Sequence, residues 1–182
     1  MPKIVDHDKY RAEIVEKAAP IFSAHGFNGL GMRQVAEQLN MSKSALYHYF
    51  PSKEELFAAC TRFVVGRDEE KATAPAITGT PEERCRQLTV VILEIEKEFP
   101  GELYLLVDYI RAKSSSEIAR DENMQHANER YLSMVSHYVG EAAAPRVLGV
   151  ALGGLVQRLF DGMTTSMDDI ERWMLDALLS EA

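Results

Sequence analysis

Apolar residues recur every three to four positions along almost the whole chain, and this spacing limits the fold more than any other feature of the sequence. In a helix such residues share one face, whereas a half-buried strand alternates apolar and polar residues. No segment alternates convincingly, and no Asn-Gly or Asp-Gly pair offers a hairpin turn. The sequence therefore predicts an all-α protein with about nine helices.

Capping residues, prolines and glycines indicate where these helices begin and end. The expected helices cover about residues 8–25, 32–39, a short stretch opened by Ser42, a longer helix from Pro51-Ser52 to about 71, and then 81–99, 102–112, 116–140, 145–163 and 167–179. The segment 72–80, rich in Ala, Thr, Pro and Gly, is the clearest linker. We expect two domains, with residues 1–53 forming the first and residues 54–182 the second.

The tightest connection lies between the second and third expected helices, which are separated only by Asn40, Met41 and Ser42. Two short helices joined so closely must cross steeply and need a third helix to cover their apolar side, as in a helix-turn-helix. In the helix that follows, Leu46 and Phe50 are four positions apart and form the buried side. Lys43, Ser44, Tyr47 and His48 are then left to face the major groove of DNA or its walls.

The net charge of the chain is -8, which taken alone argues against a polyanionic partner. Its distribution is uneven: residues 1–53 carry a net charge of +2 and the remainder carries -10. Exposed charges act over only about 8–10 Å at cellular salt. A mildly basic face can therefore meet phosphate although the whole chain is acidic, and charge alone leaves the question open.

Four stretches carry a resemblance to a known family: Gly26-Phe27, Met32-Arg33-Gln34-Val35-Ala36, Met41 to Phe50, and Ser52-Lys53-Glu54-Glu55-Leu56. Together they resemble the DNA-binding domain of the TetR family of transcriptional regulators, over about residues 11–57. The resemblance implies a three-helix DNA-binding domain followed by a helical domain for ligand binding and dimerisation. It also implies a homodimeric repressor that a ligand releases from a near-palindromic operator. The amino terminus shows no apolar stretch like that of a secretory signal, so we expect a cytoplasmic protein.

The resemblance also implies which residues contact DNA. Arg33, Gln34 and Ser44 are candidates for base edges or nearby backbone, with Arg33 as the best base reader because a guanidinium binds guanine bidentately. The remaining candidates offer donors to phosphate: Ser42, Lys43, Tyr47, His48 and Lys53. Two positions depart from the family pattern. Gly31 replaces a Ser or Thr that often contacts phosphate, and Leu39-Asn40 replaces a small Ala-Gly pair.

Each contact has a simpler alternative. Tyr47 and Tyr49 can be half-buried packing residues, His48 a solvated histidine, and Lys53 merely the first residue of a helix. A lysine at a helix start opposes the helix dipole, however, so phosphate contact would explain its presence.

The carboxyl-terminal helices resemble the family's dimerisation helices, which form a four-helix bundle about a twofold axis. The expected interface residues are Leu148, Leu152, Leu155, Leu159, Ile170, Trp173, Met174 and Ala177, unless these form a purely intramolecular core. A small effector, if present, is expected among Tyr104, Asp108, Tyr109, Arg111, Met124, Tyr131, Met134 and Tyr138, with Asp108 or Arg111 pairing with a polar group. Plain core packing is the alternative for each of these residues.

Other classes of protein find little support in the sequence. No Gly-rich phosphate loop, nucleophile elbow or His-Glu-x-x-His motif is present, and we expect no enzyme, no cofactor and no metal. Glu122, His126 and Glu129 share a helical face but lack a partner motif.

Cys60 and Cys85 form no Cys-x-x-Cys pair and are expected to be buried thiols. No apolar run reaches the ~20 residues of a bilayer span, so no membrane partner is expected. A helical interaction protein remains the alternative function.

Overall fold

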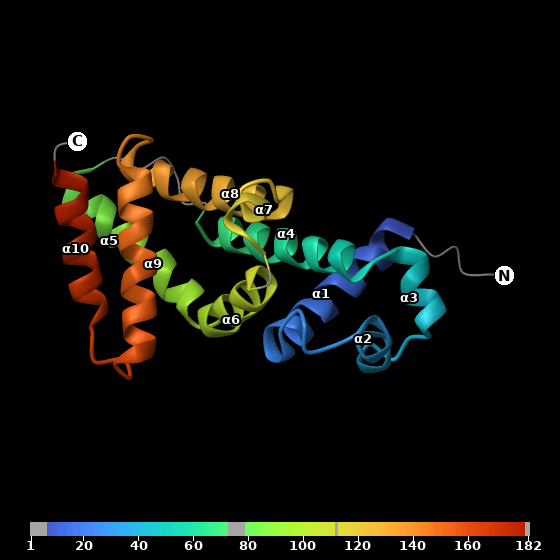
Figure 1. Ribbon diagram of the computed structural model, residues 1–182. Helices are drawn as coiled ribbons and strands as arrows, with labels where there is room; N and C mark the ends of the chain where they lie inside the picture. Colours follow the sequence, from blue (N-terminus) through green and yellow to red (C-terminus); the bar gives the residue numbers. More distant parts are fainter. Residues whose placement is uncertain (1–6, 73–78, 112, 181–182) are drawn as a thin grey trace. The chain divides into compact units, whose positions relative to one another are not determined.

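The computed structural model describes residues 7–72, 79–111 and 113–180, with the side chains of 67–72 left aside (Figure 1). All regular structure in these residues is helical, which confirms the predicted all-α fold. The ten helices are α1 (His7–His25), α2 (Met32–Gln38), α3 (Lys43–Tyr49), α4 (Lys53–Ala72), α5 (Pro81–Glu96), α6 (Phe99–Ile110), α7 (Ser115–Ile118), α8 (Glu122–Val139), α9 (Ala144–Phe160) and α10 (Met167–Leu179).

Side-chain caps start several of these helices where the sequence places Ser or Thr. The hydroxyl of Thr80 accepts a hydrogen bond from the Glu83 N–H at 3.3 Å, and the Glu83 carboxylate accepts one from the Thr80 N–H at 2.9 Å. Ser166 and Asp169 form the same reciprocal pair at the start of α10. These caps satisfy backbone donors that the first helical turn leaves without partners.

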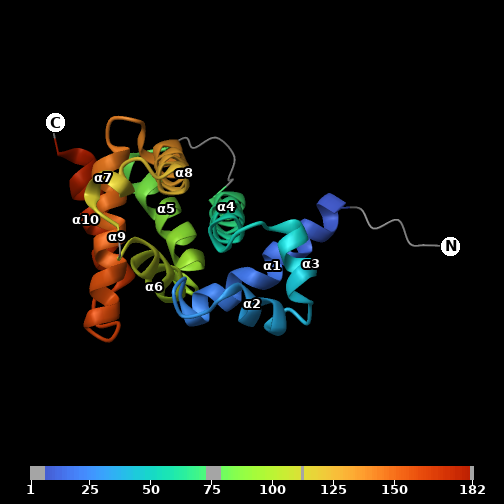
Figure 2. The same cartoon turned by 45° about the vertical axis from the view of Figure 1, so that its right-hand side comes forward.

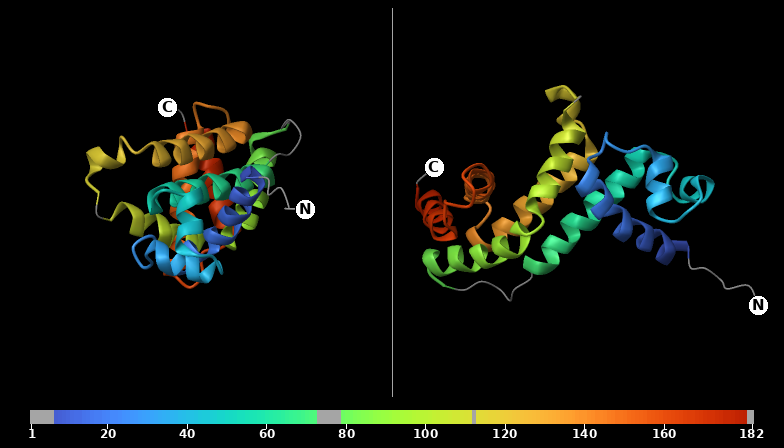
Figure 3. Two further views of the ribbon diagram at one scale, coloured as in Figure 1. Left: turned by 90° about the vertical axis from the view of Figure 1, so that its right-hand side faces the viewer. Right: turned by 90° about the horizontal axis from the view of Figure 1, so that it is seen from below.

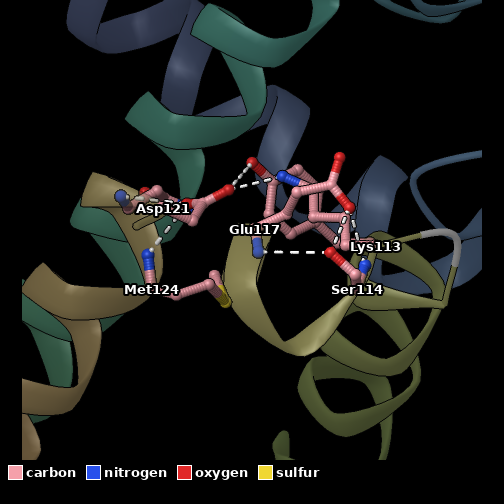
Figure 4. Close-up of polar contacts among 7 residues, drawn as sticks. Lys113, Ser114, Glu117, Asp121 and Met124 are labelled. Carbon is pink, nitrogen blue, oxygen red and sulfur yellow. Dashed lines mark hydrogen bonds and ion pairs between the residues drawn. The ribbon is translucent and has the colours of Figure 1, made fainter. Parts of the chain in front are cut away.

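The segment expected to form one helix over residues 116–140 forms two, α7 and α8. Asp121 causes the break, because its Oδ1 accepts hydrogen bonds from the backbone N–H groups of Asn123 and Met124 at 3.1 Å each. This is the geometry of a helix cap, so α8 begins at Glu122 (Figure 4). Ser114 caps the short α7 through the Glu117 N–H. The same side-chain caps therefore explain why ten helices are found where about nine were expected.

By contacts between residues, the chain divides into two compact units, residues 1–64 with 101–125 and residues 65–100 with 126–182. In the first unit, α1 to α3, the start of α4 and most of α6 surround one apolar core. Its centre holds four aromatic rings, those of Phe22, Phe27, Phe57 and Tyr109, with neighbouring centroids 4.3–6.5 Å apart. Figure 2 shows α1, α2 and α3 following one another at the amino-terminal end of this unit.

In the second unit, α10 packs against both α9 and α5. Helices α9 and α10 lie side by side in Figure 1 and in the right-hand view of Figure 3. A Cβ added at Gly154 would lie 2.7 Å from Ile170 Cγ1, so glycine permits this close approach. The guanidinium of Arg158 on α9 also pairs with the carboxylate of Glu96, the last residue of α5, at 2.5 Å.

The packing of α9 and α10 divides the expected dimer residues by their burial. Four of them are buried within the subunit: Leu148, Leu155, Ile170 and Met174. Their burial agrees with the alternative of an intramolecular core. Leu152 and Trp173 are exposed, and Leu159 and Ala177 are partly exposed. The part of all eight residues in a dimer interface stays a prediction.

None of the helices in the described ranges is by itself long and apolar enough to cross a bilayer. Only α8 and α9 taken together meet this test of length and composition, and they are bent by 107° at their junction.

Candidate nucleic-acid interface

The turn between α2 and α3 is tight because Asn40 adopts a left-handed backbone conformation, with φ of 55°. Asparagine tolerates this region better than most residues, so it serves where the family pattern has glycine. The Met41 N–H donates to the carbonyl of Ala36 at 2.9 Å, which closes the end of α2. Two residues later, α3 begins.

Helix α3 has the two-sided character that the sequence predicts. Leu46 and Phe50, at its end, are fully buried in the core of the first unit. The candidate contact residues of this helix and its cap are all exposed: Ser42, Lys43, Ser44, Tyr47 and His48. The prediction that Lys43, Ser44, Tyr47 and His48 lie on the exposed side of the helix is confirmed, while their contact with DNA stays a prediction.

Local contacts order this exposed face. Ser42 Oγ accepts a hydrogen bond from the Ala45 N–H at 3.1 Å, which confirms the predicted cap, and it lies 3.1 Å from Ser44 Oγ. The Lys43 ammonium lies over the Tyr47 ring, 5.4 Å from the centroid. One turn of helix therefore brings a cation, an aromatic ring and two hydroxyls together on the solvent side, and each can contact a DNA backbone.

The carboxyl end of α3 packs against α1. The Tyr49 ring lies 5.3 Å from that of Tyr10 and 4.6 Å from that of His7. Tyr49 is thus a packing residue, which was the simpler alternative. The ring of His48 lies 5.6 Å from that of His7. The contact of His7 with α3 was not predicted from the sequence, because no local spacing relates the start of α1 to the end of α3.

Lys53 is held more tightly than a freely solvated lysine. Its ammonium donates a hydrogen bond to the carbonyl of Leu30 at 3.3 Å and lies 4.3 Å from the centroid of the Phe27 ring. The side chain is half-buried and fastens the segment before α2 to the start of α4. This contact gives Lys53 a structural role, and its predicted phosphate contact stays untested.

Gly31 has no side chain that could cap α2, and the side chain of Gln34 bonds to the Gly31 backbone instead. The side-chain oxygen of Gln34 accepts a hydrogen bond from the Gly31 N–H at 2.8 Å, which is one half of a capping box. Bidentate recognition of adenine needs both the oxygen and the amide nitrogen of a glutamine. The cap occupies the side-chain oxygen of Gln34 in the free protein, and its predicted contact with DNA stays a prediction.

Arg33 is the other base-reading candidate on α2. Its Nε donates to Oε1 of Glu37, one helical turn later, at 2.9 Å. Both side chains are well exposed, with 79% of the arginine and 59% of the glutamate side chain accessible. Glu37 was not predicted from the sequence as a partner of Arg33. The spacing of four residues between opposite charges on a helix could have identified it.

The candidate effector residues divide between the two units. In the first unit, Asp108 is buried, and its Oδ2 accepts a hydrogen bond from the Asn28 N–H at 2.5 Å. The Asn28 side-chain amide donates in turn to the Asp108 carbonyl at 2.9 Å. These bonds, outweighing burial, and the nearby cations of Arg111 and Lys53 hold the pKa of Asp108 below its ordinary value. Asp108 is thus already engaged in fixing the segment between α1 and α2.

Tyr109 is engaged as well. Its hydroxyl donates to Asp121 Oδ2 at 2.8 Å, and Lys113 donates to the same oxygen (Figure 4). Burial raises the pKa of Asp121, but the hydrogen bonds from Lys113, Tyr109 and the Met124 backbone outweigh it and leave the pKa lowered. Met124 packs against the core of this unit.

The other candidates show no common placement. Tyr104 is exposed on α6, and Arg111 lies just after that helix, 3.4 Å from the Asp108 carboxylate. In the second unit, Met134 and Tyr138 are buried and Tyr131 is partly exposed on α8. The role of these residues in binding an effector stays a prediction.

Comparison with known proteins places these features in a family. Residues 14–60 match the family model described as bacterial regulatory proteins, tetR family. A transcriptional repressor named AcnR, from Corynebacterium diphtheriae, is 40% identical over 52 residues, which cover 29% of this chain and 27% of that protein. The matched segments span 48%, 60% and 27% of the length of the first three curated relatives.

Solved structures resemble the whole fold. A TetR-family member from Streptomyces coelicolor matches with a TM-score of 0.73 and 18% identity, covering 94% of this chain and 99% of that one. The multidrug binding protein EbrR, complexed with imidazole, matches with a TM-score of 0.69 and 16% identity, covering 94% and 96%. The short turn and the exposed face of α3 lie within residues 14–60, the segment that matches the tetR family of bacterial regulatory proteins, and the whole chain shares its fold with the solved structures.

Proposed function

We propose that this protein is a transcriptional regulator that binds a specific DNA sequence through α2 and α3. The observation that carries the proposal is the division of α3 into a buried side, Leu46 and Phe50, and an exposed side bearing Lys43, Ser44 and Tyr47. Seated in a major groove, the exposed side brings a cation and hydroxyl groups to the phosphates. The family match over residues 14–60 supports the same function.

We further propose that the protein acts as a homodimer. Helix α9 carries an exposed face on which Leu152 is 45% and Phe160 is 83% accessible. A Cβ added at Gly149 or Gly153 would meet nothing within 4 Å, so this face has no cover from the subunit itself. Trp173 on α10 is also exposed. A second copy seated on this face would bury these side chains and align two recognition helices about one turn of DNA apart.

We also propose that the protein represses transcription until a small molecule binds it. The related AcnR is named a repressor, and the structurally similar EbrR was solved with imidazole. A ligand can release DNA only to the extent that it binds the free form more tightly than the DNA-bound form. By linkage, DNA must then weaken ligand binding by the same factor.

Selection of bound duplexes from a random DNA pool tests the function. The proposal predicts an enriched, near-palindromic site whose preference over scrambled DNA survives an increase in salt, although both affinities fall. Repeating the selection with metabolite extracts tests the release by a ligand. Enrichment of no sequence would contradict the proposal and favour a helical interaction protein that uses the helix-turn-helix only as a fold element.

A further inference from the structure

We infer that Glu37 determines the base specificity of this protein by holding Arg33 in the geometry that reads guanine. The inference rests on the proposed function, since it concerns how the α2 residues read a DNA site. It starts from the hydrogen bond between Arg33 Nε and Glu37 Oε1, at 2.9 Å on the exposed side of α2.

This bond leaves the far end of the guanidinium available. Of the three guanidinium nitrogens of Arg33, Glu37 occupies Nε, and among the described residues the two terminal nitrogens make no hydrogen bond. These two nitrogens form the parallel fork that matches O6 and N7 of guanine. The glutamate therefore directs the arginine toward an end-on approach to a base and away from a sideways approach through Nε.

The carboxylate has a second effect, which opposes binding to phosphate. An arginine without a counter-charge is drawn to any DNA backbone, and such contacts carry no sequence information. Glu37 neutralises part of this attraction and brings a negative charge toward the duplex. Binding away from the correct base is then penalised, while binding at guanine keeps both terminal hydrogen bonds.

The size of the effect depends on the surroundings of the pair. In water an exposed pair four residues apart on a helix biases the arginine by only about twofold. In a groove, water is displaced and the charges interact more strongly. We therefore expect Glu37 to contribute roughly three- to tenfold to the discrimination against a wrong base, and little to the stability of the free protein.

Neighbouring residues leave Arg33 as the base reader on this helix. Gln34 uses its side-chain oxygen to cap Gly31. Val35 and Ala36 are buried. Gln38 is exposed at the end of the helix, and its amide nitrogen lies 3.5 Å from Nε2 of His25. We therefore assign the base specificity of α2 to Arg33 and to the residue that orients it.

The test measures equilibrium binding of the full chain to its selected duplex, to each single-base variant and to scrambled DNA. Arg33→Ala should lose roughly 5- to 100-fold discrimination at one base pair. Glu37→Ala should lose discrimination at the same base pair and bind scrambled DNA more tightly. Glu37→Gln, whose amide oxygen can still accept from Nε, should retain more discrimination than Glu37→Ala. Melting curves confirm that each variant is folded.

A double variant isolates the interaction. In an Arg33→Ala background, Glu37→Ala should change discrimination by less than about 1.5-fold, because no arginine remains to be oriented. Equal loss in both backgrounds, unchanged discrimination in Glu37→Ala, or an effect at a different base pair would each overturn the inference while leaving the proposed function intact. A wild-type chain without any sequence preference would instead overturn the proposed function, and this inference with it.

Discussion

The carboxylate of Asp108 on α6 accepts a 2.5 Å hydrogen bond from the backbone N–H of Asn28, a residue 80 positions earlier in the chain. The bond fixes the segment between α1 and α2 to α6 within the first unit. Gly26 makes room for it: its φ is 74°, and an added Cβ would lie 2.9 Å from Asp108 Oδ2. The segment that precedes the candidate DNA-reading helices is thus held by a charged hydrogen bond.

Removal of this charge should destabilise the protein. We expect Asp108→Asn to lower the free energy of unfolding by about 1–2 kcal/mol at neutral pH, since hydrogen bonds to charged groups are worth more than neutral ones. Urea unfolding measures the change. Glu16→Gln, on an exposed residue of α1, serves as a control for the loss of one negative charge.

The same carboxylate gives a dependence on pH with a defined sign. Because the pKa of Asp108 is lower in the folded protein than the ordinary value near 3.9, its contribution is present above that value and is lost as the pH falls through the lowered pKa. The difference in stability between wild type and Asp108→Asn should therefore be constant above about pH 5 and shrink below about pH 4. A difference that grows on acidification would contradict this assignment.

Substitution of Gly26 tests the close approach itself. We expect Gly26→Ala to cost about 1–3 kcal/mol, because the residue has a positive φ and its new methyl group would meet Asp108 and Tyr104. Gly66→Ala is a matched control, since Gly66 lies inside α4 and an added Cβ there meets nothing within 4 Å. That variant should stabilise the protein by about 0.5–1 kcal/mol. Equal effects of the two substitutions on urea unfolding would refute the packing argument.

The two cysteines should be unreactive in the folded protein. Burial raises the pKa of Cys60 to about 12, and burial with the nearby Glu171 raises that of Cys85 to about 11. Thiolate is the reactive form, so a thiol reagent at pH 8 should label neither residue quickly. Both should react once urea unfolds the chain. Rapid labelling of the native protein would contradict the burial of these thiols.

The proposed dimer face gives a further prediction. Leu152→Glu should shift the protein to a monomer and weaken operator binding, because a buried charge without a partner opposes association. The matched control is Gln87→Glu, which adds the same charge at an exposed position of α5 and should leave a dimer. Light scattering coupled to gel filtration measures the mass. A monomeric wild type, or a dimer that survives Leu152→Glu, would exclude this face.

Features set by neighbouring residues could be predicted from the sequence. Ser42 and Ser166 cap helices through contacts three positions away, so their roles are visible in the local pattern. The break between α7 and α8 was missed although it is also local, because an aspartate inside a helical pattern does not stand out as a cap. Its cause, Asp121, is identified only by its hydrogen bonds to Asn123 and Met124.

Features that depend on distant partners could not be predicted in this way. Leu148 and Leu152 are one helical turn apart on the same apolar stripe, yet the first is buried and the second is exposed. The position of α10 decides which of them faces the core. Likewise, Lys53 was expected to point toward phosphate, and its contact with the Leu30 carbonyl depends on a loop 23 residues earlier.

Binding of DNA by the exposed face of α3 can be measured through the affinity of one variant at several salt concentrations. Lys43→Ala should weaken binding to the selected and scrambled duplexes alike and reduce the salt dependence of binding by about one phosphate contact. Lys97→Ala, which removes an exposed lysine that pairs with Glu94 at the end of α5, should change neither. Unaltered affinity and salt dependence in Lys43→Ala would contradict the account.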